Sequence, residues 1–533
     1  YILVMIIQTA TNYISAYGAC KAELYIGRDL KRETFNHLQT LSFSYFNQNS
    51  VGYTHARVMS DTDRIASTLA WGLMEAVWYI AYLLLAIVMM FVLNWKLALC
   101  VMVIVPVLVI SGAYFQKKLV FFHRRVREQN SKITGAFNEG ITGAKTTKTL
   151  VIEDKVEQEF DDLTGEMKRL SVRAMHFRSV FMSTTAFAAS IALAIVLWRG
   201  GVITRDGVIL IGTLSVFMNY AQGMMEPVQW LVQVMSSLVN VQVNVERVTR
   251  LLETESDVSD TPEVTAKYGD AFHPKKENWE PLYGDIEFQD VPFRYPDGSE
   301  NVLEHFNLKV PQGTNVAIVG ETGAGKSTLV NLVCRFFEPT QGRILIDGRD
   351  ARERSQLWLH SNIGYVLQTP HLFSGTVLEN LRYGRPAATM DEIEAAVKAV
   401  SADQIIARLP DGYDSDIGEG GNTLSTGEKQ LLSFARALLA DPRIFVLDEA
   451  TSSVDTVTER LIQDAIEKVM AGRTSFIIAH RLSTIRHADV ILVVHDGKII
   501  ESGTHRSLMN AKGAYYQLYT HQYREEQTRS MMD

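Results

Sequence analysis

At residues 320–328 the chain has the sequence Gly320-Glu321-Thr322-Gly323-Ala324-Gly325-Lys326-Ser327-Thr328, which fits G-x-x-x-x-G-K-[ST] without a mismatch. The apolar run 315–319 before it predicts a buried strand, and 329–333 behind it continues at helical spacing. A strand, a glycine loop and a helix together predict a phosphate cradle, because the loop N–H groups and the helix N-terminus favour negative charge. We expect Lys326 to reach the outer phosphates and the Ser327 hydroxyl to ligate Mg²⁺.

Polar residues end three further apolar runs that we interpret as strands of the same sheet. Asp448 and Glu449 end the run 443–449, Gln368 follows 363–367, and His480 follows 474–479. Because α/β sheets bind ligands at strand carboxyl ends, Asp448 and Gln368 are candidates for the metal shell and Glu449 for orienting or deprotonating a water. His480 is a candidate for the γ-phosphate or a backbone group beside it. Tyr295 could stack on an adenine ring, although most tyrosines only pack.

A capping box lies at 425–428, where Ser425 is followed three residues later by Glu428. This pattern predicts the start of a helix over 429–439. Helix capping alone explains the two residues. A capped helix N-terminus with a glycine could also bind a second phosphate from outside, and the sequence leaves both interpretations open.

The first half of the chain is dominated by long apolar runs, namely 1–19, 73–93, 97–114, 180–198 and 207–234. A run of about 20 residues crosses a hydrocarbon core of about 30 Å. Tight connections at 94–96 and 199–206 join them into hairpins, which favours membrane spans over buried helices of a soluble core. Because the chain opens inside an apolar run, we expect it to be cut from something longer.

The distribution of basic residues predicts the orientation of these runs. Basic residues crowd the long connections, at Arg28, Lys31, Arg32, Lys117, Lys118, Arg124, Arg125, Arg127 and Lys132. The tight turns carry only Lys96 in one case and Arg199 and Arg205 in the other. Since Lys and Arg mark the cytoplasmic side, the long connections are expected to be cytoplasmic, where ATP is available.

The long connections show helical periodicity and turn at 42–52 and 140–150. We hypothesise that both turns dock on the nucleotide-binding half, since Phe43 and Phe46 need a surface to pack on; ordinary solvent-exposed corners are the alternative. Glu75 lies near the start of one apolar run, where it is expected at the membrane interface, and Glu226 in the last run either faces an aqueous cavity or lies at that interface.

The composition of the 533 residues supports a membrane half and a nucleotide-binding half, and it argues against nucleic-acid binding and against a disulfide or zinc scaffold. Periodicity stops over 254–283, which predicts a surface linker. The net charge of −8 gives no case for a nucleic-acid partner. The three cysteines are far apart, which supports neither a disulfide framework nor a zinc cluster.

Taken together, these residues resemble the ATP-binding-cassette (ABC) transporters of the exporter type, over essentially the whole chain. The resemblance rests on GETGAGKST at 320–328, Gln368, LSTGE at 424–428, FVLDE at 445–449, SSVD at 452–455 with Asp455, and His480. It implies an ATPase with an all-α polytopic transmembrane domain at 1–253, a linker at 254–283, an α/β P-loop NTPase cassette at 284–520 and a tail at 521–533. Five of the usual six membrane helices are then visible, with the first expected upstream.

The resemblance also implies roles and partners. Tyr295 matches the adenine-stacking aromatic, Glu419 the acidic residue of the loop facing the membrane helices, and 42–52 and 140–150 the coupling helices. Two chains are expected to pair head to tail, so that each ATP lies between one phosphate loop and the other chain's signature. Further expected partners are membrane lipid and a small hydrophobic substrate (drug, lipid or peptide). The expected location is the plasma (inner) membrane.

The signature departs from the family's LSGGQ, since Thr426 and Glu428 replace Gly and Gln. Ser425 and Gly427, the expected phosphate contacts, remain, but Glu428 places a negative charge near a triphosphate. We therefore expect a heterodimer in which the partner carries a normal signature and an altered catalytic acid; a homodimer is the alternative. An importer with exporter architecture, as in siderophore systems, and a non-pumping channel or regulator are the competing functions. Real membrane spans would exclude a soluble cassette acting on DNA or ribosomes.

Overall fold

The computed structural model describes residues 1–448, 456–479, 482–521 and 523. The chain divides into two compact units, one made of residues 1–37 and 52–253 and the other of 38–51 and 254–533.

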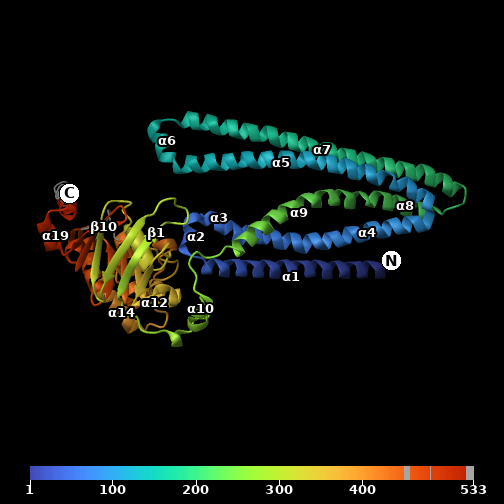
Figure 1. The fold of residues 1–533 in the computed structure, drawn as a ribbon. Helices are drawn as coiled ribbons and strands as arrows, with labels where there is room; N and C mark the ends of the chain where they lie inside the picture. The colour runs from blue at the N-terminus through green and yellow to red at the C-terminus, as the bar shows by residue number, and fades with distance from the viewer. Residues whose placement is uncertain (449–455, 480–481, 522, 524–533) are drawn as a thin grey trace. The chain divides into compact units, whose positions relative to one another are not determined.

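The first unit is built from helices (Figure 1). Its elements are α1 (Ile2–Thr40), α3 (Val51–His55), a π-helical turn at Ala56–Asp61, α4 (Thr62–Met102), α5 (Ile104–Thr142), α6 (Ala144–Leu150), α7 (Glu153–Arg205), α8 (Ile211–Gly223) and α9 (Met225–Leu252). The helices α5 and α7 run side by side as a long pair, with the Phe122 and Phe177 rings stacked 5.1 Å apart.

Two helical segments of the described chain, Val51–Met102 and Glu153–Arg205, are long and apolar enough to cross a membrane by length and composition. Only 11% of the most apolar stretch of the first and 17% of that of the second is buried in the structure. Side chains such as Val92 and Trp198 are 74% and 69% exposed. The helices of a soluble core would bury such residues, so this exposure favours lipid as their environment.

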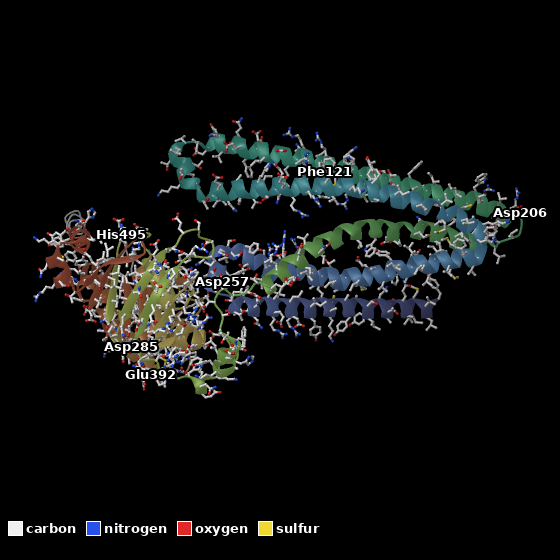
Figure 2. The ribbon with its side chains drawn as sticks, viewed as in Figure 1. Phe121, Asp206, Asp257, Asp285, Glu392 and His495 are labelled. Carbon is white, nitrogen blue, oxygen red and sulfur yellow. The ribbon has the colours of Figure 1, made fainter. Side chains whose placement is uncertain are left out.

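Asn94 interrupts α4 at the place where the sequence predicts a tight turn. Its backbone angles, φ −161° and ψ 105°, are not helical, and its Oδ1 accepts a hydrogen bond from the Leu97 N–H at 3.1 Å. Asn94 therefore caps a new helical segment. A small core packs around this break and buries Met90, Leu97, Ala98, Val101, Val196, Ile209, Phe217, Ala221 and Met224. Figure 2 places Asp206, which follows α7, at the same end of this unit.

The second unit contains a six-stranded sheet in the order β10-β9-β3-β8-β7-β6 and a four-stranded antiparallel sheet in the order β2-β1-β4-β5. The strands are β1 (Ile286–Phe293), β2 (Leu303–Val310), β3 (Asn315–Val319), β4 (Arg343–Ile346), β5 (Arg349–Asp350), β6 (Ile363–Val366), β7 (Ile444–Asp448), β8 (Thr474–Ile478), β9 (Val490–His495) and β10 (Lys498–Gly503). All pairs of the larger sheet are parallel except β9 and β10, which form a hairpin through Asp496 and Gly497.

The larger sheet separates two hydrophobic cores, and β3 shows why. Val316 and Ile318 pack in the core shared with the smaller sheet and α11 (Lys326–Val333), whereas Ala317 and Val319 pack in the core on the other face. This alternation is the period of two that a strand imposes on its side chains. The helices of this unit are α2 (Phe43–Gln48), α10 (Pro262–Tyr268), α11, α12 (Gln356–Ser361), α13 (Val377–Arg382), α14 (Met390–Ala399), α15 (Asp403–Ile406), α16 (Thr426–Leu439), α17 (Thr456–Met470), α18 (Leu482–Arg486) and α19 (His505–Ala511).

The segment 254–283 contains more fixed structure than its lack of periodicity predicts. It forms α10, and Tyr268 at the end of α10 is only 1% exposed. The Tyr268 hydroxyl donates to Glu280 at 2.7 Å, and the Trp358 indole N–H donates to the Glu280 carbonyl at 2.6 Å. These hydrogen bonds attach the segment to the cassette. They leave no hydrophobic periodicity in the sequence, which is why the sequence predicts only a surface linker here.

Candidate functional site

The phosphate loop connects β3 to α11 at the carboxyl edge of the larger sheet, and close packing requires two of its glycines. A Cβ on Gly320 would overlap the carbonyl oxygen of Val494 on β9. Gly325, with φ +99°, caps α11 in a conformation that favours glycine. The Gly497 N–H donates to the Ala324 carbonyl at 3.1 Å, which ties the loop to the β9–β10 turn. Backbone atoms therefore line this loop, and contacts with β9 and with the β9–β10 turn hold it in place.

Lys326 closes this loop on itself. Its Nζ donates to the carbonyl oxygens of Gly320 at 2.8 Å and of Glu321 at 2.7 Å, and the residue is 8% exposed. Burial lowers the pKa of the Lys326 ammonium, and the charge of Asp448 acts in the opposite direction. An ammonium held over a backbone cradle fits a phosphate chain, because phosphate oxygens can replace the two carbonyl acceptors.

Tyr295 lies on the helix side of the same loop. Its hydroxyl and the Thr328 hydroxyl are 2.9 Å apart, in a hydrogen bond. The ring makes edge contacts with Phe293 and Phe337, with ring centroids 4.9 and 5.1 Å away. These contacts fix the tyrosine beside the loop, and its role in stacking on adenine stays a prediction.

The strand order places the other predicted residues at this edge. In the sheet, β7 lies between β6 and β8, and β8 lies beside β3. Asp448 is the last residue of β7, and Gln368 follows β6 by two residues with an exposed side chain. The parallel register aligns Asp448 with Ile478 and Ile478 with Ile318. Asp448 and Gln368 therefore come from the same sheet edge as the phosphate loop.

Three predicted residues, Glu449, Asp455 and His480, lie outside the described residues. Glu449 directly follows the end of β7. Within the described ranges, no group of three or more His, Cys, Asp or Glu side chains could hold a metal ion by protein ligands alone. A Mg²⁺ site built from Ser327, Gln368, Asp448 and nucleotide phosphates needs no such group, because Mg²⁺ commonly uses one or two carboxylates plus phosphate oxygens.

The segment Ser425–Glu428 forms the capping box that its spacing predicts. The Ser425 Oγ accepts from the Glu428 N–H at 3.3 Å, and Glu428 Oε2 accepts from the Ser425 N–H at 2.9 Å. Ser425 and Thr426 are exposed, whereas Gly427 is buried. The helix α16 begins at Thr426, three residues earlier than expected, because the cap residue itself precedes the first turn.

Arg408, which the sequence reasoning missed, also contacts the signature. Its Nη2 donates to Glu428 Oε1 at 3.0 Å. Arg408 lies just after α15 and 20 positions before Glu428. No local spacing rule pairs residues at that separation.

The turn at 42–52 contributes α2 to the second unit, and an aromatic contact fixes it there. The Phe43 ring stacks on Phe336 with centroids 4.4 Å apart, and Phe336 in turn contacts the rings of His360 and Tyr365 at 5.4 and 5.6 Å. Phe46 sets its ring edge-on to Tyr45 at 5.5 Å. Glu419 is exposed on a short 3₁₀ turn, Glu419–Gly421. The coupling roles of Phe43, Phe46 and Glu419 stay predictions.

Both carboxylates of the apolar runs are hydrogen-bonded within the first unit. The Trp230 indole N–H donates to Glu75 Oε2 at 2.7 Å, and the Tyr79 hydroxyl donates to Glu226 Oε1 at 2.9 Å. The Tyr79 and Trp230 rings lie 5.1 Å apart. These contacts cross between α4 and α9 and offset part of the cost of placing carboxylates in apolar helices.

Comparison with known proteins places this geometry in a family. Residues 1–228 match the ABC transporter transmembrane region, and residues 303–452 match the ABC transporter domain. The chain is 34% identical over 520 residues to a putative multidrug export ATP-binding/permease protein, YgaD, of Bacillus subtilis, covering 98% of this chain and 88% of that protein. It is 36% identical over 498 residues to an ATP-dependent lipid A-core flippase of Desulfotalea psychrophila, covering 93% and 84%. The solved structure of a bacterial Atm1-family ABC exporter with ATP bound superposes with a TM-score of 0.77 at 28% identity, covering 94% and 86%.

Proposed function

Because this chain belongs to the ABC transporter family, we propose that it moves a hydrophobic or amphipathic substrate out of the cytoplasm as one half of a dimer. The predictions of an exporter-type half-transporter, of an all-α transmembrane domain followed by an α/β cassette, and of an ATPase that drives export are confirmed by the relatives. The chain is an integral membrane protein that binds ATP in a cytoplasmic domain. The substrate class, the location in the plasma membrane and the nature of the partner are the proposed parts.

The observation that carries the proposal is the arrangement of Lys326, Asp448 and Gln368 at one sheet edge. Lys326 and the loop N–H groups would hold the phosphates, and Ser327, Gln368 and Asp448 would hold Mg²⁺. Mg²⁺, when bound, supplies positive charge that stabilises the phosphoryl group during transfer. Glu449, next to Asp448 in the sequence, would orient the attacking water and accept its proton, with His480 beside the γ-phosphate.

For the partner, we propose a second half-transporter that differs from this chain. The altered signature Ser425–Glu428 supports this, because the phosphate loop and its acids match the family whereas Thr426 and Glu428 do not. The site completed by this signature would then be the weaker of two. A homodimer is the alternative, and comparing the ATP turnover of the chain alone with that of the mixed dimer separates the two.

For the substrate, we propose a drug-like or lipid-like amphipath. Its support is the likeness to relatives named as a multidrug exporter and a lipid A-core flippase, together with the apolar character of α4 and α7. The bilayer also supplies lipid as a surrounding partner. An importer and a non-pumping channel are the competing functions.

Transport in reconstituted vesicles tests this function. Vesicles in which the cassettes face outward should accumulate an amphipathic dye when Mg-ATP is added outside. The Lys326→Ala variant should abolish this accumulation, because the phosphates lose their point charge. ATP-driven release of the dye from such vesicles would show an importer, and dye flux independent of Lys326 would show a channel.

A further inference from the structure

The signature of this chain carries a negative charge where the partner's nucleotide phosphates are expected. Glu428 lies in the first turn of α16, and its carboxylate accepts from the N–H of Ser425, an expected phosphate contact. Uncompensated, this charge would repel a triphosphate and weaken the favourable field of the helix N-terminus. A chain that uses this signature therefore needs a positive charge nearby.

Arg408 supplies that charge. Its Nη2 donates to Glu428 Oε1 at 3.0 Å while Glu428 Oε2 accepts from the Ser425 N–H at 2.9 Å, so both carboxylate oxygens are engaged. The guanidinium is itself steered by an Nε–H bond to the Gln404 carbonyl at 3.2 Å. The pair lies at the surface, with the Arg408 and Glu428 side chains 69% and 24% exposed.

We propose that Arg408 is a positioning residue of the ATP cycle, which neutralises Glu428 and keeps Ser425 and Gly427 able to receive the phosphates of ATP bound to the partner. This inference rests on the proposed function, since it assumes that the signature completes a site in a dimer. The inference also predicts that nucleotide still binds at the site that this signature completes. The Arg408–Glu428 pair carries no net charge, so it takes the place of the neutral glutamine of the family's signature.

An ordinary surface ion pair is the competing explanation, and the chain contains a matched control for it. At the start of α14, Thr389 and Glu392 form the same kind of capping box, and Arg385 pairs with Glu392 in the same manner. Glu392 is labelled in Figure 2. This second box has no predicted ligand. If the ion pair only stabilises its helix, removing the arginine should have the same small effect at α16 as at α14.

The test compares Arg408→Ala with Arg385→Ala in the full chain prepared as a dimer of identical copies, in which the signature of one copy completes the ATP site of the other. For Arg408→Ala we expect the KM for Mg-ATP to rise about threefold or more, because a like charge is left near the phosphates. The ATP concentration that gives half of the maximal thermal stabilisation of the Glu449→Gln variant should rise by a similar factor. Arg385→Ala should change neither value, and both variants should keep the melting temperature of the parent without nucleotide.

Two further measurements separate charge neutralisation from a structural role. In the Glu428→Gln background, where glutamine still completes the capping box, Arg408→Ala should have no further effect on the KM. The defect of Arg408→Ala alone should also shrink at high ionic strength, since salt screens the exposed charge. An unchanged KM and half-saturation in Arg408→Ala, or an equal defect with Gln at 428, would overturn the inference. Absence of ATPase activity in the unaltered chain combined with its partner would instead overturn the proposed function, while the half-saturation would still decide the role of Arg408.

Discussion

At the scale of single residues, different side chains of the phosphate site are expected to bind the nucleotide and to carry out its hydrolysis. Lys326 donates to two carbonyl oxygens of the loop and is buried, so we propose that it holds the phosphate charge. Glu449 follows Asp448 at the end of an apolar strand, where a carboxylate can meet a water beside the phosphates. Replacing Lys326 should therefore impair ATP binding, whereas replacing Glu449 should impair hydrolysis.

Glu449→Gln should keep ATP binding and lose hydrolysis by about 10²- to 10⁴-fold, because the amide cannot accept a proton from the attacking water. ATP turnover and Mg-ATP-induced thermal stabilisation measure the two properties separately. Lys326→Ala is the contrasting variant and should lose the stabilisation as well. Turnover close to that of the parent in Glu449→Gln would remove this residue from its assigned role.

At the scale of elements, an aromatic stack joins α2 to the cassette. Phe43 lies on Phe336 at 4.4 Å, and Phe336 is supported by His360 and Tyr365. Phe46 instead packs its ring against Tyr45 of its own helix. If α2 couples the cassette to the membrane helices, we predict that Phe43 contributes more to this coupling than Phe46.

Phe43→Ala should leave basal ATP turnover near that of the parent and reduce the transport per ATP several-fold, because the aromatic contact between α2 and Phe336 is lost. Dye accumulation and phosphate release measured on the same vesicles give this ratio. Phe46→Ala is the matched control, with a smaller expected effect. Equal coupling in the parent and in Phe43→Ala would contradict a role for this stack.

His360, whose ring contacts Phe336, is expected to make the stability of the cassette depend on pH. Its Nε2–H donates to the Cys334 carbonyl at 2.9 Å, and burial lowers its pKa below the ordinary value of 6.5. The charge of Arg335 acts in the same direction, whereas Asp260 opposes it. Below pH 6.5 the unfolded chain therefore binds more protons at this residue than the folded chain, so stability falls as the pH drops.

We expect His360→Gln to reduce this loss, since glutamine can still donate to the carbonyl but does not titrate. The melting temperature of the cassette, followed by tryptophan fluorescence from pH 7.5 to 5.5, should fall more steeply in the parent than in the variant. Because His360 binds at most one proton, it can change the free energy of unfolding by at most about 1.4 kcal/mol per pH unit. Parallel curves over this range would show that His360 does not titrate as argued.

The sequence predicted best those features that a short stretch encodes by itself. The loop 320–328 and the capping box at 425–428 each depend on local backbone chemistry, and the structure forms both of them. The Phe43–Phe336, Arg408–Glu428 and Tyr268–Glu280 contacts join residues without shared periodicity, so no spacing rule could pair them. The interruption at Asn94 was predictable because its flanking runs are each long enough to span a membrane alone.

At the scale of the whole molecule, the proposed dimer would place the phosphate loop and the signature of this chain in two different ATP sites. The phosphate loop, Asp448 and Glu449 match the family, whereas Thr426 and Glu428 alter the signature. The neutralisation of Glu428 by Arg408 supports nucleotide binding at the altered site but does not restore the missing glycine. The two sites of the dimer should therefore be unequal in hydrolysis and more nearly equal in binding.

This inequality predicts the behaviour of the chain with and without a partner. Purified alone, the chain should bind Mg-ATP but turn it over at least about tenfold more slowly than with a partner carrying the unaltered signature, because glycine there lets the backbone approach the phosphates more closely. Mass measurement in detergent would establish which chains are present, and ATP turnover per dimer would compare the two preparations. Within the mixed dimer, Glu449→Gln in this chain should abolish nearly all hydrolysis, since the partner is expected to lack the catalytic acid. A dimer of this chain alone with full turnover, stimulated by an amphipathic substrate, would instead establish a homodimer in which Arg408 and Glu428 together replace the glutamine of the signature.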